Sequence, residues 1–452
     1  MNAIRPAAVA GMFYPAAPKD LAWELEDMLA HAPGDGFAPG FPKAMIVPHA
    51  GYIYSGSCAA AAYDMLRPAR GIVRRVVLLG PCHRVAVRGI ALPEATAFVT
   101  PLGSIPIDRE AVGQISGLPQ VVVSSAVHAQ EHALEVQLPF LQHVLGEFSL
   151  VPLAVGAATA QQVSEVIEKL WGGDETLILI SSDLSHYHPY AEACAIDRGT
   201  VDAILAFNTG IDHEQACGAT PIAGMLLAAK NHGLVPQLLD LRNSGDTAGG
   251  KGKVVGYASF AYWAGADKFG EEHGARLIAI ARNSIEAALE VAKLAPLPDE
   301  QWLKLARATF ITLTQEGRLR GCIGSLEAHR PLGQDARKNA LAAAFSDPRF
   351  PPLTRDELSR TRVEVSLLST PKLLAFADHA DLIAQLHPGE DGLILECGGK
   401  RGTFLPQVWE SIPDAEQFIA QLKLKAGLPA NTSTAKCQVK RYRVLKWKEA
   451  AV

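Results

Sequence analysis

The chain has 452 residues, of which 48% are hydrophobic and 20% are charged, so it is long enough for two or three domains and too apolar for a disordered protein. Its formal net charge of -5 at pH 7 gives no electrostatic footprint for nucleic acid or an anionic membrane surface. No apolar run approaches the roughly 20 residues of a membrane-spanning helix, and the start lacks the apolar core of a signal peptide.

The cysteines indicate a reducing compartment, so we expect a cytoplasmic protein. They are odd in number, scattered, and never spaced as C-x-x-C, which excludes a zinc ribbon or a disulfide framework. Each one is interpreted first as a small buried hydrophobic residue. The neighbours of Cys82 and Cys322 also favour a functional role. The seven are Cys58, Cys82, Cys194, Cys217, Cys322, Cys397 and Cys437.

Apolar runs alternate with helical patterns through the first 260 residues. The runs are rich in Val, Ile and Leu, as expected of strands buried on both faces. The predicted strands are 44–47, 75–79, 121–124, 150–155, 176–180, 237–241 and 254–262. The predicted helices between them are 58–66, 134–145, 161–171 and 222–231. This alternation predicts an α/β domain, residues 1–265, with a largely parallel sheet flanked by helices.

The pattern changes after Trp263. Residues 264–274 are polar and contain glycine, as is typical of a linker. Helices and hairpins then mix, which predicts a smaller α+β domain over residues 272–450. Its predicted elements are helix 275–294, a hairpin of strands 308–313 and 319–326, helix 332–345, strand 362–368, a hairpin around Gly398-Gly399, and helix 415–426.

Coordinating side chains follow several predicted strands of the first domain. His49, His83, His186 and Asp246 each come shortly after such a strand. If the strands are parallel neighbours, these side chains converge beyond their carboxyl ends. Two imidazoles and one carboxylate suit non-heme Fe(II), so we expect two of these histidines to bind metal with Asp246 and a further histidine to act as general base. Taken singly, each histidine is more often structural, and an Asp after a strand is usually a turn residue.

A second candidate is the segment from His128 to His132, which fits the H-x-x-E-H pattern of a zinc hydrolase. The pattern requires a helix, but residues 121–127 are small and β-branched. We therefore favour a loop that runs into a helix, with Glu131 and His132 lining the same pocket as the other histidines.

Five strings in order make the first domain resemble the Memo family (mediator of cell motility) from about residue 3 to residue 263. They are VPHAGYIYSG (47–56), LGPCH (79–83), EHALEVQLPF (131–140), SSDLSH (181–186) and CGATPI (217–222). Memo proteins resemble class III extradiol dioxygenases of the LigB type, which use non-heme iron to cleave aromatic rings.

The resemblance implies that His49 and His83 match metal-binding histidines and that His186 matches the third pocket histidine, the candidate catalytic base. It also implies a pocket lined by Tyr54, Cys82, Glu131, His132 and Asp183. The animal Memo pocket has a cysteine in the loop before the last strand, where this chain has Thr247 beside Asp246. We therefore expect Fe(II) as the cofactor, with Zn or Cu as alternatives.

The second domain resembles the AMMECR family, whose fold is α+β, from about residue 275 to residue 447. The likeness rests on LRGCIG (319–324), SDPRFPPLTRDEL (346–358), VEVSLL (363–368) and TFLP (403–406). The motif residues are Arg320, Gly321, Cys322, Gly324 and Arg349. Arg320 shares a strand face with Cys322 if side chains alternate, and a cation there would lower the thiol pKa and favour a catalytic nucleophile. A buried cysteine in a tightly packed hairpin is the alternative that we favour.

The two resemblances together are similar to the AmmeMemoRadiSam system in one chain, which implies a radical-SAM protein as partner. The chain itself has no cysteine triplet for an iron–sulfur cluster. Our leading hypothesis is a metal-dependent, oxidative enzyme acting on a small molecule. The alternatives are a non-catalytic metal- or ligand-binding protein that recognises a partner and, more weakly, a zinc-dependent hydrolase.

Overall fold

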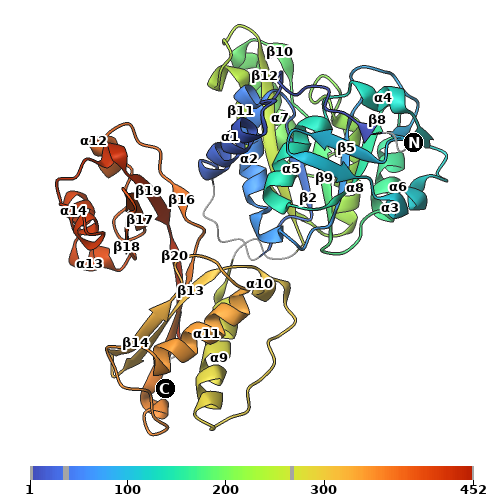
Figure 1. The fold of residues 1–452 in the computed structure, drawn as a ribbon. Helices are drawn as coiled ribbons and strands as arrows, with labels where there is room; N and C mark the ends of the chain where they lie inside the picture. Colours follow the sequence, from blue (N-terminus) through green and yellow to red (C-terminus); the bar gives the residue numbers. More distant parts are fainter. Residues whose placement is uncertain (1–3, 34–39, 265–268, 450–452) are drawn as a thin grey trace. The chain divides into compact units, whose positions relative to one another are not determined.

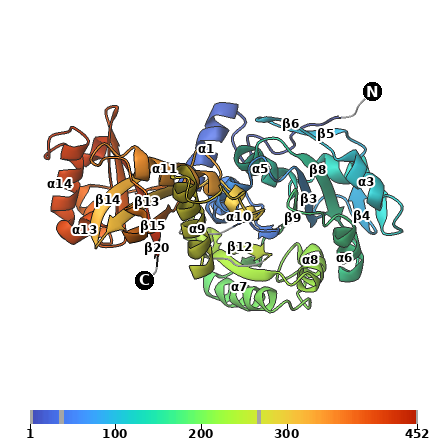
Figure 2. The ribbon, with the colours of Figure 1, turned by 90° about the horizontal axis from the view of Figure 1, so that it is seen from below.

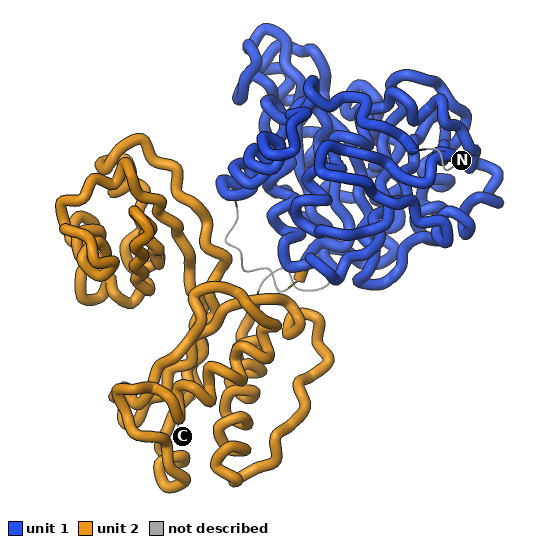
Figure 3. Tube along the Cα trace, viewed as in Figure 1, with its two compact units in different colours: residues 1–34, 41–266 blue, residues 35–40, 267–452 orange. Residues whose placement is uncertain are grey.

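The computed structural model describes residues 4–33, 40–264 and 269–449. The chain divides into two compact units, Met1–Gly34 with Phe41–Ala266 and Asp35–Gly40 with Asp267–Val452 (Figure 3). Two boundaries predicted from the sequence, at residues 265 and 450, fall outside the described residues. Within the described residues, no helix is both long enough and apolar enough to cross a membrane.

Unit 1 is built on a nine-stranded mixed sheet in the order β10-β12-β2-β9-β3-β8-β4-β7, with β11 paired to β12. Its strands are β2 (Ala44–Val47), β3 (Arg75–Pro81), β4 (Ile90–Leu92), β7 (Val121–Val123), β8 (Ser149–Val155), β9 (Thr176–Ser181), β10 (His186–His188), β11 (Val235–Asn243) and β12 (Val254–Trp263). A separate three-stranded sheet contains β1 (Ile4–Arg5), β5 (Ala97–Thr100) and β6 (Gly103–Pro106).

The prediction of an α/β domain is confirmed, but the sheet is parallel only in part. Strands β2, β9, β3 and β8 pair in parallel and are buried almost throughout, which explains their continuous apolar sequences. In contrast, β12 is antiparallel to β2, β10 and β11. The link between β11 and β12 is shorter than the dozen or so residues that a parallel crossover needs, so these two strands pair in the antiparallel sense.

Helices cover both faces of this sheet and make a three-layer unit (Figure 2). One face packs against α1 (Pro18–Ala30), α2 (Ser57–Asp64) and α5 (Leu138–Leu145). The other packs against α6 (Ala160–Lys169), α7 (Tyr190–Leu205) and α8 (Ala219–Asn231). The sequence analysis missed α1 and α7.

Short elements complete unit 1 and matter because they carry the site. A π-helical turn, η1 (Tyr52–Gly56), follows β2 and leads into α2. The others are η2 (Arg67–Ala69), α3 (Arg109–Ile115), α4 (Ser125–Ala129), η3 (Glu135–Gln137) and η4 (Ser244–Asp246).

Unit 2 contains a first sheet in the order β14-β13-β15-β20, beside α9 and α11 (Figure 1). Its core joins Leu277 and Ala340 of the helices to Ile311 and Val365 of the strands. The elements of this part are α9 (Glu271–Ala288), α10 (Gln301–Lys304), β13 (Ala308–Gln315), β14 (Arg318–Gly324), α11 (Leu332–Phe345), η5 (Leu358–Arg360), β15 (Thr361–Leu368) and β20 (Val444–Lys448).

A second sheet of unit 2, in the order β16-β19-β17-β18, has its own core under α14. The elements here are β16 (Lys372–Leu373), α12 (His379–Ala384), β17 (Gly392–Cys397), β18 (Lys400–Phe404), α13 (Val408–Ser411), α14 (Ala415–Lys425), η6 (Thr434–Lys436) and β19 (Gln438–Tyr442). The predicted helix 332–345 is confirmed, whereas α9 already begins at Glu271, within the segment that the sequence analysis assigned to a linker. Residues 265–268 of that segment lie outside the described residues.

Candidate metal centre

Three imidazoles meet at the carboxyl edge of the parallel strands. His49 follows β2, His83 follows β3, and His132 precedes η3. One ring nitrogen from each lies within 4.8 Å of the other two, and this is the one such group of metal-ligating side chains among the described residues. The sequence analysis expected His49 and His83 to meet. It gave His132 only a pocket-lining role, whereas the structure makes it the third member.

The hydrogen bonds of His49 fix its tautomer. Its Nδ1 lies 2.9 Å from Ser181 Oγ. That hydroxyl donates its proton to the Ala133 carbonyl at 2.6 Å and accepts a hydrogen bond from Gln137 Nε2 at 2.8 Å. Since the hydroxyl has one proton, His49 Nδ1 must be the donor to Ser181, and Nε2 is left with its lone pair available.

Glu131 orients His83. The backbone N–H of His83 donates to Glu131 Oε2 at 2.6 Å, and the ring Nδ1 lies 2.9 Å from Oε1. This carboxylate is buried, and it also accepts the backbone N–H of Ala133. Although burial opposes ionisation, the hydrogen bonds and the charge of His83 lower the pKa of Glu131 to about 2. The ionised carboxylate therefore accepts a hydrogen bond from the N–H at Nδ1 of His83. The lone pair of His83 Nε2 is left available.

His132 is held by packing more than by hydrogen bonds. Its ring lies 4.9 Å from the ring of Phe13 and stacks on His83 at 4.7 Å. Its Nδ1 is buried without a hydrogen-bond partner, 3.4 Å from Glu131 Oε1. An orphaned buried nitrogen is costly unless something else satisfies it, and a metal ion would do so.

The electrostatics keep His49 and His132 neutral. Burial, with the neighbouring imidazole His83, lowers the pKa of His49 to about 3. Burial, with the neighbouring His49, lowers the pKa of His132 to about 4. Neutral imidazoles are the form that binds metals, so the donor set fits an ion.

Two further groups lie beside His49 Nε2. Cys217 Sγ is 3.5 Å away, and Asp183 Oδ2 is 4.0 Å away. The other oxygen of Asp183 accepts the backbone N–H of His49 at 2.7 Å. Burial raises the pKa of Cys217 to about 12 and also raises the pKa of Asp183. Sequence reasoning missed Cys217, although it opens the C-G-A-T-P-I string that leads into α8.

The remaining expected pocket residues are His186, Cys82 and Tyr54. His186 is half-buried at the start of β10, and its charge helps to lower the pKa of His49. Cys82 is half-buried after β3, where burial and the charge of Glu131 raise its pKa to about 12. Tyr54 lies on η1 with 39% of its surface exposed.

Asp246 and His128 are not brought into the group. The Asp246 carboxylate accepts Tyr190 Oη at 2.6 Å and the backbone N–H of Asn243 at 2.9 Å. Strand β12 lies between β11, which leads to Asp246, and β2, which leads to His49. The carboxyl ends of β11 and β2 are therefore two strand spacings apart, roughly 10 Å. His128 is buried, and its Nε2 bonds the Ala91 carbonyl at 2.9 Å. The H-x-x-E-H pattern therefore supplies one member of the trio, not a complete zinc-hydrolase site.

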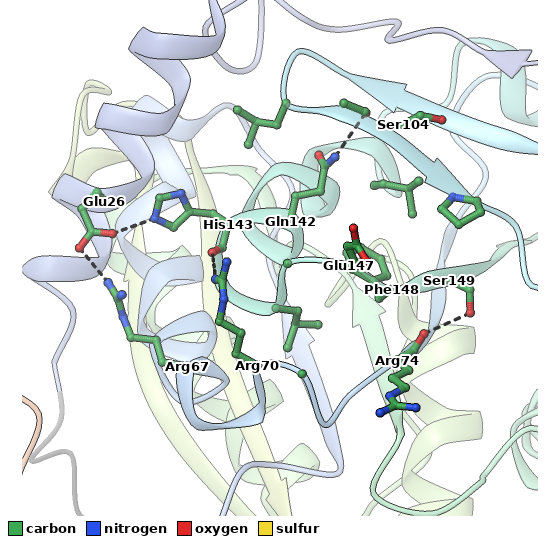
Figure 4. A pocket seen from close by; sticks show the side chains of 17 residues that line it. Glu26, Arg67, Arg70, Arg74, Ser104, Gln142, His143, Glu147, Phe148 and Ser149 are labelled. Carbon is green, nitrogen blue, oxygen red and sulfur yellow. Dashed lines mark hydrogen bonds and ion pairs between the residues drawn. The ribbon is translucent and has the colours of Figure 1, made fainter. Parts of the chain in front are cut away.

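A separate open groove in unit 1 is lined by arginines (Figure 4). Arg67 pairs with Glu26 at 3.2 Å, and Arg70 donates to the His143 carbonyl at 2.9 Å. Because these two guanidinium groups are satisfied within the protein, we do not assign a ligand to this groove.

In unit 2, the glycines of the R-G-C-I-G motif are explained by packing. A Cβ at Gly321 would overlap the carbonyl oxygen of Ala343, and one at Gly324 would overlap the ring of Phe310. The register of β13 and β14 shifts between Leu313 and Thr314, so the strict alternation on which the pairing of Arg320 with Cys322 was predicted does not hold here.

Arg320 instead forms a bidentate pair with Glu357, at 2.9 and 3.1 Å. The Cys322 thiol accepts the Thr312 hydroxyl at 3.4 Å. Arg349 binds the Cys322 carbonyl at 3.2 Å and pairs with Asp347. The motif arginines thus bind the hairpin and the following loop. Cys322 itself is half-buried, so the expectation of a buried cysteine is met only in part.

An α/β unit that gathers three imidazoles at its sheet edge defines a candidate metal-binding protein. The chain matches the family model described as Memo-like protein over residues 5–261 and the model described as AMMECR1 over residues 278–447. It therefore belongs to the Memo family and carries an AMMECR1 domain in the same polypeptide.

Curated relatives are similar to its N-terminal part. A MEMO1 family protein of Sulfolobus acidocaldarius is 35% identical over 279 residues, which cover 57% of this chain and 98% of that protein. A MEMO1 family protein of Aquifex aeolicus is 36% identical, over 56% of this chain and 97% of its own length.

A crystal structure of an uncharacterized Pyrococcus horikoshii protein matches 40% of this chain and 93% of its own, with 32% identity and a TM-score of 0.36.

Proposed function

We propose that unit 1 is a metal-dependent enzyme of the dioxygenase-like oxidoreductase type that acts on a small molecule, with the ion held by His49, His83 and His132. The observation that carries the proposal is the approach of three ring nitrogens within 4.8 Å of one another. Hydrogen bonds to Ser181 and Glu131 leave the Nε2 atoms of His49 and His83 unprotonated, as metal ligation requires.

The donor set supports a divalent transition metal, for which non-heme Fe(II) is our first choice and Zn or Cu the alternatives. When bound, such an ion would supply Lewis-acid and redox chemistry with coordination positions open to substrate. The Asp183 carboxylate lies 4.0 Å from His49 Nε2 and would balance part of the charge of the ion.

The role of His186 in this proposal is proton transfer. Its ring is half-buried beside the trio and is not one of the three grouped ligands. A hydroxyl group of a bound substrate could pass its proton to this imidazole, because an imidazole exchanges protons near neutral pH. Tyr54, partly exposed on η1, would contact the same substrate.

The alternative is a non-catalytic metal- or ligand-binding protein that recognises a partner. The observation that favours it is in unit 2, where Arg320 pairs with Glu357 and Arg349 pairs with Asp347, so neither guanidinium group is left without an internal partner. In either case we propose a radical-SAM protein of an AmmeMemoRadiSam system as the partner. Co-elution of the two purified proteins in size-exclusion chromatography would support this, and separate elution at micromolar concentrations would argue against it.

The metal proposal is tested by elemental analysis of protein purified without air and reloaded with Fe(II). We expect about one ion per chain in the wild type and in the Asp246→Asn and His128→Ala variants. We expect loss of stoichiometric binding in His49→Ala, His83→Ala and His132→Ala, each checked for folding by circular dichroism. Full metal content in folded His132→Ala, or its loss in Asp246→Asn, would overturn the assignment of ligands.

A further inference from the structure

Two cysteines of unit 2 lie opposite each other on neighbouring strands. Strands β17 and β19 are antiparallel, and the residue pair at one end of their ladder is Glu396 with Gln438. The same register places Cys397, the last residue of β17, opposite Cys437, the residue just before β19. Directly opposed residues of an antiparallel pair have Cα atoms about 4.5–5.5 Å apart. A disulfide accepts Cα separations of about 4.4–6.8 Å.

The hydrogen bonding indicates that Cys397 and Cys437 form a non-hydrogen-bonded pair of the antiparallel ladder, the kind in which the side chains are closer. The backbone N–H of Cys437 donates to the Thr434 carbonyl of η6 at 2.9 Å, so it does not donate to the backbone carbonyl of Cys397 across the ladder. Side chains of non-hydrogen-bonded pairs approach more closely than those of hydrogen-bonded pairs.

Both side chains point into the core under α14. Cys397 continues the inward series of Leu393 and Leu395, and Cys437 precedes the inward-facing Val439 by two residues. Each cysteine is 8% exposed. The two thiols lie against the same short stretch of backbone, because Cys397 Sγ is 3.6 Å from the Lys436 carbonyl oxygen and Cys437 Sγ is 3.4 Å from the Ser433 carbonyl oxygen.

We propose that Cys397 and Cys437 are a modification site that hydroperoxides convert to a cross-strand disulfide. Each thiol donates to a backbone carbonyl, Cys397 to Lys436 at 3.6 Å and Cys437 to Ser433 at 3.4 Å. Loss of either proton gives an attacking thiolate, and the products are the same when Cys397 attacks first. The Cys397 sulfur attacks the peroxide oxygen, the O–O bond breaks, and a sulfenic acid and an alcohol (or water) result. The Cys437 sulfur then displaces the sulfenic oxygen as water. Two thiols are oxidised and one peroxide is reduced.

The bond would fasten the start of β19 to the end of β17. Gly398 and Gly399, both at positive φ, make the tight turn into β18 directly after Cys397. A hollow beside this turn is lined by Glu396, Cys397, Lys400, Arg401 and Lys436. Oxidation would therefore fix the backbone on two sides of that hollow without a change in its charged groups.

The experiment treats the folded full-length protein with hydrogen peroxide, blocks remaining thiols in denaturant, and maps tryptic peptides by mass spectrometry. We expect peptides 373–400 and 437–440 to be linked with the loss of two hydrogens, in a band that runs as a monomer on a non-reducing gel. Dithiothreitol should separate them. The link should persist in Cys322→Ser and be absent from Cys397→Ser and Cys437→Ser.

Several results would overturn the proposal. One is both thiols remaining free after prolonged peroxide treatment of folded wild type. Another is a link from either cysteine to Cys194 or Cys322, or a link found only in covalent dimers. As a second measurement, oxidation should raise the midpoint of thermal unfolding of the wild type and leave that of Cys397→Ser unchanged. An equal shift in both would also contradict it.

Discussion

Glu131 binds His83 twice, through the backbone N–H at 2.6 Å and through the ring Nδ1 at 2.9 Å. One buried carboxylate thus sets both the backbone position and the ring orientation of a candidate ligand. The same carboxylate lies 3.4 Å from the Nδ1 of His132. The orientation of His83 therefore depends on a residue that need not touch the ion.

The Glu131→Gln variant tests this dependence. A neutral amide cannot accept the ring proton and the backbone proton of His83 as a carboxylate does, so the ring should lose its fixed orientation. We expect Fe(II) affinity, measured by anaerobic titration, to fall by about 10–100-fold. The control is Glu168→Gln, which removes a similar pair with His232 on the surface and should leave the affinity unchanged. Equal affinity in both variants would contradict the role of Glu131.

A buried ion pair holds the segment that carries this glutamate. Arg5 pairs with Glu135, and it also donates to the carbonyls of His128 and Glu131 at 2.9 and 2.7 Å. Replacement of Arg5 by Met leaves Glu135 buried without its cation. We expect the free energy of unfolding to fall by about 3–5 kcal/mol in denaturant titrations.

The comparison for Arg5→Met is Arg67→Met, which breaks exposed pairs with Glu26 and Asp64. Exposed pairs contribute about 0–1 kcal/mol, so this variant should stay near wild type. A loss in Arg5→Met no larger than that of Arg67→Met would show that the buried pair does not stabilise unit 1.

Packing should make the Gly321→Ala variant unstable. A Cβ at this position would overlap the carbonyl oxygen of Ala343, which backbone movement alone could relieve. We expect a lower midpoint of thermal unfolding, with a loss of about 1–3 kcal/mol. In Gly333→Ala the new methyl meets the flexible end of Leu297 at 3.3 Å and Leu303 Cβ at an ordinary contact distance of 3.5 Å, so stability should change little. Wild-type stability in Gly321→Ala would mean that the motif glycine serves something other than packing.

The pH dependence of unfolding should report on Glu357. Hydrogen bonds from Arg320, with further donors on Thr354 and Gln315, lower its pKa from 4.5 to about 2. A carboxyl whose pKa is lower in the folded state stabilises the fold above pH 4.5, and this contribution is lost as the pH falls toward 2. Glu357→Gln should therefore be less stable than wild type at pH 6, and the difference should shrink below pH 4. A constant difference across this range would contradict the assignment.

The sequence predicted the parts of the site that depend on parallel strands. His49 and His83 each come directly after a buried apolar run, and neighbouring strand ends must meet. His132 follows no strand, and its position depends on the turn before η3 and on its packing against Phe13, neither of which leaves a periodic signal. Asp246 was placed at the site because the sequence does not show that β12 lies between β11 and β2.

The same limits apply to the fold. Helix α7 was missed because several of its buried residues, such as Ala193, Asp197 and Thr200, are small or polar, so its sequence has little apolar periodicity. Strand β20 was missed because its exposed positions are lysines, which made the segment read as a basic tail. Where apolar periodicity is strong, as in α6, the helix predicted at residues 161–171 is confirmed.

The single proton of Ser181 has a consequence for how an ion would be received. Because that proton is donated to the Ala133 carbonyl, the imidazole of His49 is held in the tautomer that is protonated at Nδ1 and unprotonated at Nε2 before any ion binds. Preorganisation of this kind spares the binding step both a ring flip and a proton release. A serine that never contacts the ion would thereby set how readily the empty pocket fills.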